Sequence, residues 1–407
     1  MEVIKAINCV FWGWLIAGIL LSCGIFYTIR LGFPQVRYFT QLIPNLWKAS
    51  RNATGVSAFG ALCSAIGSEV GAGSLVGVAT ALASGGPGAI FWMWVTAILG
   101  MPIMFGEAVL AQIFRVKNED GTTFRGGPAY YMRRGLNAKV LPILFSISVI
   151  IGNGVVYCMV QSNSIAGSFS GQAELPPLAI GVILVALVGL VIFGGIKRLS
   201  TVASYIVPFM AFAYIILALI VLVTHAEWIA DMFRLIIDSA FGVQQAAGGV
   251  LGYSVQEAFR YGVARGLFSN DAGAGTTPSM HAAANVKHPV NQGLSGMLGV
   301  FVTTIIVCSC TAFCILLSGA LNGSLTGIQL TQAAFSSSFG DLGHWLVAAA
   351  MFLFGYTTLL ANMYYGEVNT RYLFPDKKHA VTVYRIFALC LILFGSIVPV
   401  ISMWEFA

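Results

Sequence analysis

The sequence predicts an all-α polytopic membrane protein. Hydrophobic residues make up 58% of its 407 residues and charged residues only 9%, and the mean hydropathy is +0.85. A soluble domain of this length needs a surface much richer in charge. The apolar runs are continuous over roughly 20 residues, which is the length of a helix that crosses the bilayer core, whereas the strands of a membrane barrel would alternate apolar and polar residues.

Ten apolar segments are long enough to be predicted spans. They cover residues 8–29, 57–84, 88–114, 141–168, 178–196, 201–223, 241–262, 291–320, 342–366 and 383–402. The first run is too long for a signal peptide and has no small-residue cleavage site behind it. An amino terminus outside the cell places all but two of the 21 Lys and Arg residues in the cytoplasm, leaving Lys5 and Arg234 outside. The positive-inside rule therefore predicts this orientation in the plasma (inner) membrane.

Two further segments have an amphipathic pattern. Residues 33–50 carry apolar side chains at helical spacing among polar ones, which predicts an interfacial helix that Pro44 kinks or shortens. Residues 226–239 show a similar pattern on the outer face. All eight cysteines lie in apolar stretches, where they are interpreted as packing residues and not as metal ligands. The net charge of +6 comes from the topology signal, so no nucleic-acid partner is expected.

The second predicted span contains a glycine cluster in its middle. Gly67, Gly71 and Gly73 lie within seven residues, and each costs about 1 kcal/mol in a helix interior. The sequence therefore predicts that this span is broken at mid-membrane. Such breaks persist where they line a cavity or are buried in protein. The amide end of one half-helix can then hold a carboxylate, and the carbonyl end of the other can coordinate a small cation.

The seventh predicted span has a comparable weakness at residues 246–253, which include Gly248, Gly249, Gly252 and Tyr253. It lies five spans after the first cluster, where an inverted five-plus-five repeat would place the partner of the second span. Two glycine-interrupted segments in corresponding positions indicate a transporter site. The alternative is that these glycines are close-packing contacts between unbroken helices.

The stretch from Gly85 to Gly100, GGPGAIFWMWVTAILG, resembles the signature of the alanine/glycine:cation symporters. Further similar stretches are residues 70–81, 124–132, 265–273 and 361–367. The resemblance implies sodium-coupled uptake of alanine or glycine on a leucine-transporter-like fold with one extra N-terminal span. It divides the chain into the extra span at 1–30, the amphipathic helix at 33–50, a first five-helix repeat at 57–223 and a second repeat at 236–407. With the chain ending at Ala407, the last core helix of the second repeat is expected to be missing.

The resemblance also implies site residues. The substrate site would contain Gly71, Ala72, Gly73 and Ser74 of the first break, Asn153, Gln161 and Asn163 of the fourth span, and Gly248, Gly249, Gly252 and Tyr253 of the second break. The coupling ion, Na+, would bind the carbonyls of Gly67 and Val70 and the hydroxyls of Thr357 and Thr358. Carbonyl and hydroxyl oxygens are hard donors suited to an alkali cation. Ordinary hydrogen bonding between helices is the alternative interpretation of the two threonines.

The chain departs from the family pattern at the first break. Ala72 and Ser74 stand where relatives usually have a hydroxyl residue and an asparagine. Glu69 stands where relatives have a small residue or an arginine. A carboxylate at mid-membrane is costly and therefore a functional candidate, as a coupling acid or a partner of the substrate amine. Glu107, within the third span, is interpreted as a structural hydrogen-bond anchor in preference to a proton relay.

The expected function is sodium-coupled import of a small neutral amino acid by alternating access. The bilayer is the other partner, and no obligatory protein partner is expected. No Ser/His/Asp set converges within a span, so an enzyme is not expected. The altered ligands and the missing helix leave one alternative, a transport-deficient amino-acid-binding sensor or an incomplete paralogue.

Overall fold

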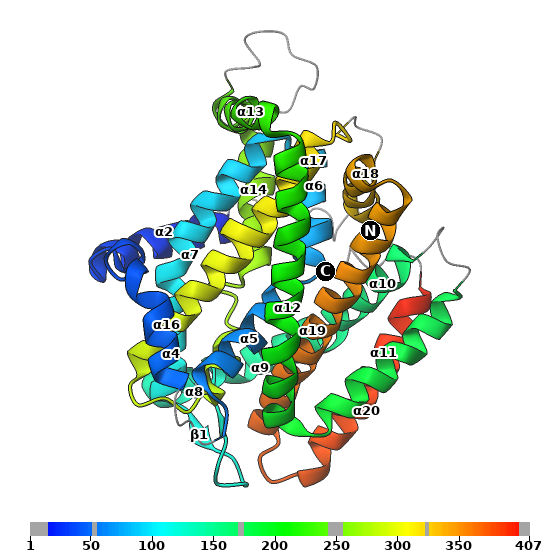
Figure 1. Ribbon diagram of the computed structural model, residues 1–407. Coiled ribbons are helices and arrows are strands. Elements are labelled where there is room, and N and C mark those ends of the chain that lie inside the picture. The colour runs from blue at the N-terminus through cyan, green and yellow to red at the C-terminus, as the bar shows by residue number, and fades with distance from the viewer. Residues whose placement is uncertain (1–14, 51–54, 170–174, 243–254, 322–324, 399–407) are drawn as a thin grey trace.

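The protein is a bundle of helices with one short β-hairpin (Figure 1). The computed structural model describes residues 15–50, 55–169, 175–242, 255–321 and 325–398. In this part of the chain, six helices are long and apolar enough to cross a membrane, or seven if a bent pair of helices counts as one span. The prediction of a helical polytopic protein is therefore confirmed at this level.

The N-terminal part packs along one side of the bundle. It consists of α2 (Ile16–Arg30), α3 (Pro34–Arg37), the 3-10 turn η2 (Phe39–Gln41) and α4 (Leu42–Ser50). The segment expected as one amphipathic helix is thus three short helices, and Pro44 lies in the first turn of the last. There a proline is tolerated because the first amides of a helix have no partner within it. Leu42 and Leu46 are buried, whereas Val36 and Trp47 are exposed apolar side chains.

The next elements contain the first broken span. They are α5 (Ala58–Glu69), the π-helical turn η3 (Gly73–Gly77), α6 (Val78–Gly85), α7 (Gly88–Ile113), β1 (Val116–Lys117), β2 (Phe124–Arg125), α8 (Pro128–Gly135), α9 (Leu141–Ile151), the π-helical turn η4 (Gly152–Tyr157), α10 (Cys158–Ser168), α11 (Pro177–Ile192) and α12 (Gly195–Thr224). The strands pair antiparallel, with Val116 opposite Arg125. The ends of α5–α6, α7 and α9–α10 agree with the predicted spans within one residue, whereas α11 ends four residues before residue 196 and α12 begins six residues before residue 201.

The second half of the chain repeats the pattern of long helices joined by short segments. It consists of the 3-10 turn η5 (Ala226–Trp228), α13 (Ile229–Phe241), α14 (Val255–Asn270), α15 (Pro278–Ala283), α16 (Pro289–Val300), the π-helical turn η7 (Phe301–Cys308), α17 (Ser309–Leu317), α18 (Gly327–Phe339), α19 (Asp341–Leu373) and α20 (Lys378–Ile397). The expected end of the seventh span at residue 262 is wrong, because α14 continues to Asn270.

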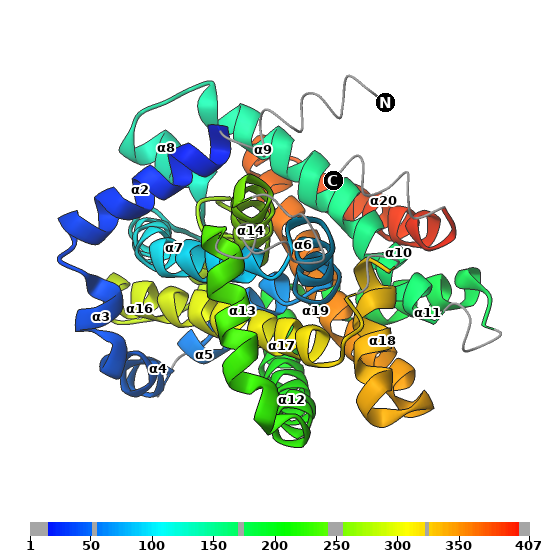
Figure 2. The ribbon, with the colours of Figure 1, turned by 90° about the horizontal axis from the view of Figure 1, so that it is seen from above.

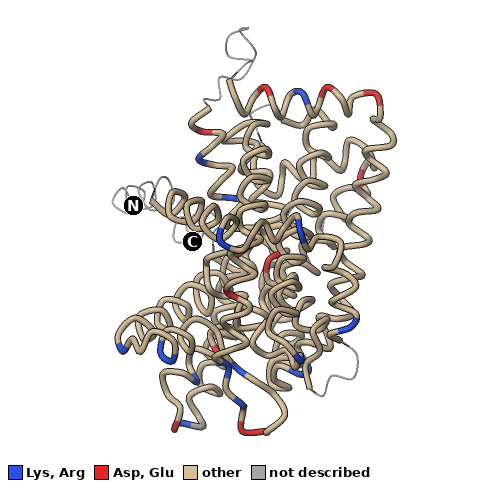
Figure 3. Tube along the Cα trace, turned by 90° about the vertical axis from the view of Figure 1, so that its left-hand side faces the viewer, with Lys and Arg blue, Asp and Glu red and all other residues tan. Residues whose placement is uncertain are grey.

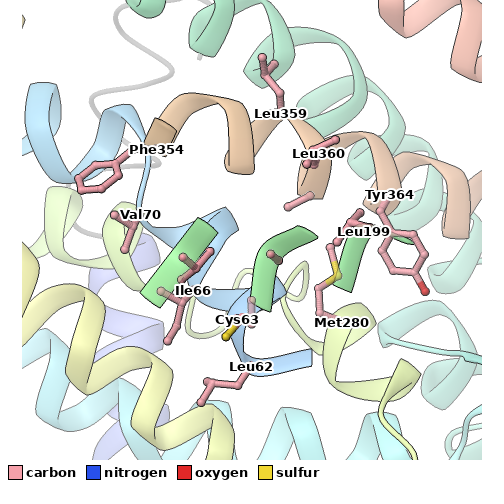
Figure 4. Packing of buried hydrophobic residues seen from close by; sticks show 14 of the residues in the cluster. Leu62, Cys63, Ile66, Val70, Leu199, Met280, Phe354, Leu359, Leu360 and Tyr364 are labelled. Carbon is pink, nitrogen blue, oxygen red and sulfur yellow. The ribbon is translucent and has the colours of Figure 1, made fainter. Parts of the chain in front are cut away.

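The interior of the bundle is formed by α5, α6 and α14, with longer helices around them (Figure 2). Helix α14 packs against α7 and α6, and α15 packs against α7 and α5. Apolar side chains of α5 meet those of α12, α15 and α19 in one buried cluster (Figure 4). The labelled members of that cluster are Leu62, Cys63, Ile66, Val70, Leu199, Met280, Phe354, Leu359, Leu360 and Tyr364.

Charge is distributed unevenly along the bundle. Lys and Arg residues gather at the end that holds β1 and β2, whereas the opposite end, covered by α13, carries mainly acidic residues (Figure 3). This separation runs along the direction of the long helices. It is the pattern that the positive-inside rule describes.

Candidate functional site

The first break lies between α5 and α6, as the glycine cluster predicts. Helix α5 ends at Glu69, and Val70 has non-helical angles of φ −90° and ψ 87°. The chain resumes helical form in η3, and the two arms are bent by 49°. Residues 70–77 are all buried. The backbone groups that the break frees must therefore find partners within the protein.

Hydroxyl groups from three other helices supply several of those partners. Thr311 Oγ1 of α17 donates to the Ser74 carbonyl at 2.9 Å, and Thr331 Oγ1 of α18 donates to the Leu75 carbonyl at 3.0 Å. Below the break, Tyr365 Oη of α19 donates to Ser68 Oγ at 2.7 Å. Side chains of α17, α18 and α19 thus form hydrogen bonds with residues on both sides of the break.

The residues expected to bind sodium lie together. Thr358 Oγ1 is 2.9 Å from the Gly67 carbonyl and 3.4 Å from the Val70 carbonyl. Thr357 lies beside them, because a Cβ on Gly67 would be 3.1 Å from Thr357 Cβ. Its own hydroxyl donates to the Phe354 carbonyl at 2.9 Å. The Thr358 hydroxyl and two carbonyl oxygens therefore converge between α5 and α19, whereas the Thr357 hydroxyl bonds within its own helix.

Gln161 is the residue of the fourth span that reaches the break. Its Oε1 accepts a hydrogen bond from the Ala72 amide at 3.1 Å. A Cβ on Gly71 would be 2.4 Å from Thr358 Oγ1 and 3.1 Å from Gln161 Nε2. Only glycine fits at this position without displacing both side chains. The amide of Ala72 thus faces an oxygen acceptor at the point where one half-helix begins.

The aromatic residues Phe268 and Tyr157 lie on another side of the first break. A Cβ on Gly73 would be 3.0 Å from Phe268 Cδ1. The Phe268 ring packs edge-to-face with Tyr157, with ring centroids 5.6 Å apart. Sequence reasoning did not select either aromatic residue, although Phe268 lies in a stretch recognised as similar to the family.

The two asparagines of the fourth span contact other helices. Asn153 Nδ2 donates to Asn362 Oδ1 of α19 at 3.1 Å. Asn163 Nδ2 donates to the Gly395 carbonyl at 2.9 Å and to the Val398 carbonyl at 2.6 Å. The Asn163 amide group therefore tethers α10 to the end of α20, away from the Ala72 amide. The structure does not bring Asn163 together with Gln161 at the break. The two residues are two positions apart on an α-helix, so their side chains point to different sides of α10.

A second interruption lies at residues 271–277, between α14 and α15. The glycine cluster selected from the sequence, with Gly248, Gly249, Gly252 and Tyr253, lies outside the described residues. In the interruption, Asp271, Gly273 and Gly275 have positive φ values of 51°, 87° and 80°. Two glycines and one Asp are the residue types that adopt this left-handed conformation most readily.

This interruption satisfies many of its polar groups internally. Asp271 Oδ2 accepts hydrogen bonds from the hydroxyls of Thr276 at 3.2 Å and Thr277 at 3.3 Å. Asn270 Oδ1 accepts from the Ala272 amide at 3.1 Å. Another partner comes from outside the interruption, because Glu107 Oε2 of α7 accepts a hydrogen bond from the Gly273 amide at 3.0 Å. Glu107 thus forms the structural hydrogen bond that its favoured interpretation required.

Glu69 lies at the end of α5 and is 3% exposed. Neither carboxylate oxygen has a hydrogen-bond partner in the described part of the chain. A Cβ on Gly299 of α16 would lie 3.6 Å from Glu69 Oε2, so a glycine leaves space in front of the carboxylate. Helix α14, which ends beside Asp271, packs against η3 and α5, so the two interruptions are neighbours within the bundle.

Comparison with known proteins places this geometry in a family. The sequence profile of the sodium:alanine symporter family matches residues 1–407. The chain is 42% identical over 409 residues to the "Probable sodium/glutamine symporter GlnT" of Bacillus subtilis, covering all of this chain and 84% of that protein. It is 35% identical over 418 residues to the sodium/alanine symporter AgcS of Methanococcus maripaludis, covering all of this chain and 90% of that protein.

Two solved structures share the fold at low sequence identity. MhsT in complex with L-phenylalanine has a TM-score of 0.58 and 15% identity, over 85% of this chain and 81% of that one. A manganese transporter of Eremococcus coleocola has a TM-score of 0.54 and 13% identity, over 85% and 70%. The fold is thus that of leucine-transporter-like membrane transporters. Together with the profile match and the two symporters, this shows that the chain belongs to the sodium:alanine symporter family, a family of membrane transporters.

Proposed function

We propose that the protein imports alanine or glycine together with Na+ by alternating access around the two interruptions. The observation that carries this proposal is the convergence of Thr358 Oγ1 with the Gly67 and Val70 carbonyls at the first break. Family membership supports sodium-coupled transport of an amino acid.

Na+ would bind between α5 and α19. Its ligands would be the carbonyls of Gly67 and Val70 and the hydroxyls of Thr357 and Thr358. The single Thr358 hydroxyl proton can be donated to the Gly67 carbonyl or to the Phe354 carbonyl of α19, at 2.9 Å and 3.0 Å. A cation would favour donation to Phe354, which leaves the oxygen free to face the ion. Because one ligand pair comes from the broken span and the other from α19, binding of the ion would join these two elements.

The substrate carboxylate would accept hydrogen bonds at the amide end of the broken span, at Ala72 and Gly73. Gln161 now accepts the Ala72 proton and would move aside or turn its amide group toward the substrate. Asp271, at the second interruption, would face the substrate amine. The choice of alanine or glycine rests on the family, which is that of the sodium:alanine symporters.

The inverted repeat is part of the same proposal. Its support is that α14 packs on α6 and α15 packs on α5, so that the halves of the two interrupted segments lie beside each other. We propose the orientation with the amino terminus outside, supported by the gathering of Lys and Arg residues at the end that holds β1 and β2 (Figure 3).

Uptake into proteoliposomes tests the proposal. Vesicles with an inward Na+ gradient should accumulate labelled alanine or glycine, and vesicles with an inward K+ gradient should not. Labelled glutamine should be tested beside them, because one relative is named as a glutamine symporter. Uptake of equal size without sodium would overturn the coupling. Saturable binding without accumulation under any gradient would favour the sensor.

We propose that Glu69 is the coupling acid, because its carboxylate is buried at the break without a hydrogen-bond partner. Either a proton or the substrate amine would then neutralise it. Glu69→Gln should change the dependence of uptake on pH while the protein remains folded. An unchanged pH profile would remove Glu69 from the coupling.

A further inference from the structure

A cavity of about 290 Å³ opens at the end of the bundle that holds the β-hairpin. It lies between the hairpin connection, the start of α12 and the last turns of α19. Its lining includes Arg125 of β2, Lys197 of α12, and Tyr364 and Arg371 of α19. Glu367, which also lines it, is nine residues beyond Thr358, or about 13 Å along the helix axis. The cavity is therefore separate from the proposed sodium site.

The buried acid of this cavity is already paired. Glu367 is 4% exposed, and its Oε1 accepts from Arg371 Nη2 at 3.1 Å. Its Oε2 accepts from Arg385 Nη2 at 2.7 Å and from Arg385 Nε at 3.0 Å. Two guanidinium groups thus face one carboxylate, which leaves a local excess of positive charge.

Asp120, in the connection of the β-hairpin, also has its hydrogen-bond partners. Burial alone would raise the pKa of Asp120, but hydrogen bonds from Thr123 and Thr122 outweigh it and lower the pKa to about 2. The two amides donate to Asp120 Oδ1 at 2.9 Å and 3.0 Å, and the Thr123 hydroxyl donates to Oδ2 at 2.7 Å. The remaining acid of the lining, Glu119, is exposed to solvent.

Several hydrogen-bond donors around the cavity remain without an acceptor. The Tyr364 hydroxyl is buried and has no hydrogen-bond partner in the described part of the chain, and neither has Arg125 Nε. Tyr364 lines the same cavity as Arg125 and Arg371. Lys197 Nζ donates to the Thr122 hydroxyl at 2.8 Å and keeps further protons for another acceptor.

We propose that this cavity binds a phosphate group. Arg125, Lys197 and Arg371 line the cavity with three acids, Glu119, Asp120 and Glu367. Arg385, which lies outside the lining, pairs with Glu367, so the lining together with Arg385 carries one net positive charge for a singly charged anion. A tetrahedral oxyanion can accept from donors on three elements at once, as the hairpin, α12 and α19 provide them. Basic pockets between membrane helices on the cytoplasmic side are suited to phosphate-bearing headgroups. The bound group would tie the hairpin to α12 and α19.

Thermal unfolding of the purified full-length protein tests the site. The probes are inorganic phosphate, compared with chloride at equal ionic strength, and nanodiscs of phosphatidylglycerol compared with phosphatidylcholine. Either phosphate source should raise the melting temperature of the wild type. Arg125→Gln and Lys197→Gln should each raise the half-saturating phosphate concentration by about tenfold, as expected for the loss of one charge-assisted hydrogen bond.

Two further variants make the result decisive. Tyr364→Phe removes one hydroxyl without changing the shape of the side chain, and it should weaken phosphate binding as well. Arg134→Gln removes an exposed charge outside the cavity and should respond as the wild type does. A response only to phosphatidylglycerol would assign the site to lipid, and a response to inorganic phosphate would assign it to the free ion. No response to either probe, or equal responses in all variants, would overturn the proposal.

Discussion

The two interruptions at the centre of the bundle are held in different ways. The first, between α5 and α6, has no residue with positive φ at 67–77, and its freed groups bond to side chains of α10, α17, α18 and α19. The second, between α14 and α15, contains three left-handed residues and bonds largely within itself, through Asp271 and Asn270. One interruption depends on its neighbours, and the other is a compact turn.

This difference indicates which interruption is suited to bind ligands and which is suited to move as a rigid unit. A break whose partners are side chains of other helices can exchange those partners for a substrate or an ion when the helices shift. A break that bonds within itself keeps its shape while it moves as a unit. The first interruption is therefore suited to bind ligands, and the second is suited to present a fixed acid, Asp271, to the same centre.

The largest effect should come from Gly71→Ala. The new methyl group would lie 2.4 Å from Thr358 Oγ1 and 3.1 Å from Gln161 Nε2, so both partners of the first interruption must move. Overpacking of this kind costs about 1–3 kcal/mol, which corresponds to a loss of sodium-driven uptake of about tenfold or more. Initial rates of labelled alanine uptake in proteoliposomes measure the effect.

The matched control for this change is Gly77→Ala, at the end of the π-helical turn that follows Gly71. The nearest atoms to a Cβ there are 3.9 Å away, so the substitution should leave uptake close to that of the wild type. Equal losses in both variants would mean that glycine is needed for the general flexibility of the segment. The contact with Thr358 would then not explain the loss of uptake in Gly71→Ala.

A smaller effect is expected from Thr358→Val. The substitution keeps the shape of the side chain and removes the hydroxyl that faces the carbonyls of Gly67 and Val70. Loss of one oxygen ligand should raise the sodium concentration for half-maximal uptake by about tenfold, since 1.4 kcal/mol corresponds to that factor. Thr358→Ser retains the hydroxyl and should restore the sodium dependence. Failure of the serine variant to do so would favour ordinary interhelical hydrogen bonding.

The sequence predicts the first interruption well because its glycines break an otherwise apolar helix. It also predicts most helix ends, since the lipid-facing helices are continuous apolar runs. The seventh span shows the limit of this reasoning. Helix α14 has Arg260 and Arg265 and is packed against α6 and α7, so its hydropathy does not mark where it ends. Burial in protein permits polar residues that lipid would not.

The site residues show a second limit. The polar side chains Gln161 and Asn163 lie two positions apart on α10 and look equivalent in sequence. In the structure Gln161 meets the Ala72 amide, whereas Asn163 meets the end of α20. Which face of a buried helix looks toward the break depends on how α19 and α20 pack around it. That arrangement involves residues more than 200 positions away, and a local pattern contains no record of it.

The smallest effect is expected at the second interruption, from Glu107→Ala. This change removes the acceptor of the exposed Gly273 amide and should destabilise the protein by about 0.5–1.5 kcal/mol, the net contribution of one hydrogen bond. Because Asp271 and Asn270 still hold the turn, uptake should keep its sodium dependence. Melting temperature and sodium titration of uptake, measured on the same preparation, separate the two effects.

Glu107→Gln distinguishes the structural interpretation of this acid from a proton relay. Its side-chain carbonyl can still accept from the Gly273 amide, so a structural anchor predicts a melting temperature near that of the wild type and an unchanged pH profile of uptake. A relay predicts the reverse, because glutamine cannot exchange a proton. A pH profile altered in Glu107→Gln but not in Glu69→Gln would move the coupling acid from the first interruption to the second. The interruption that bonds within itself would then have a direct part in coupling.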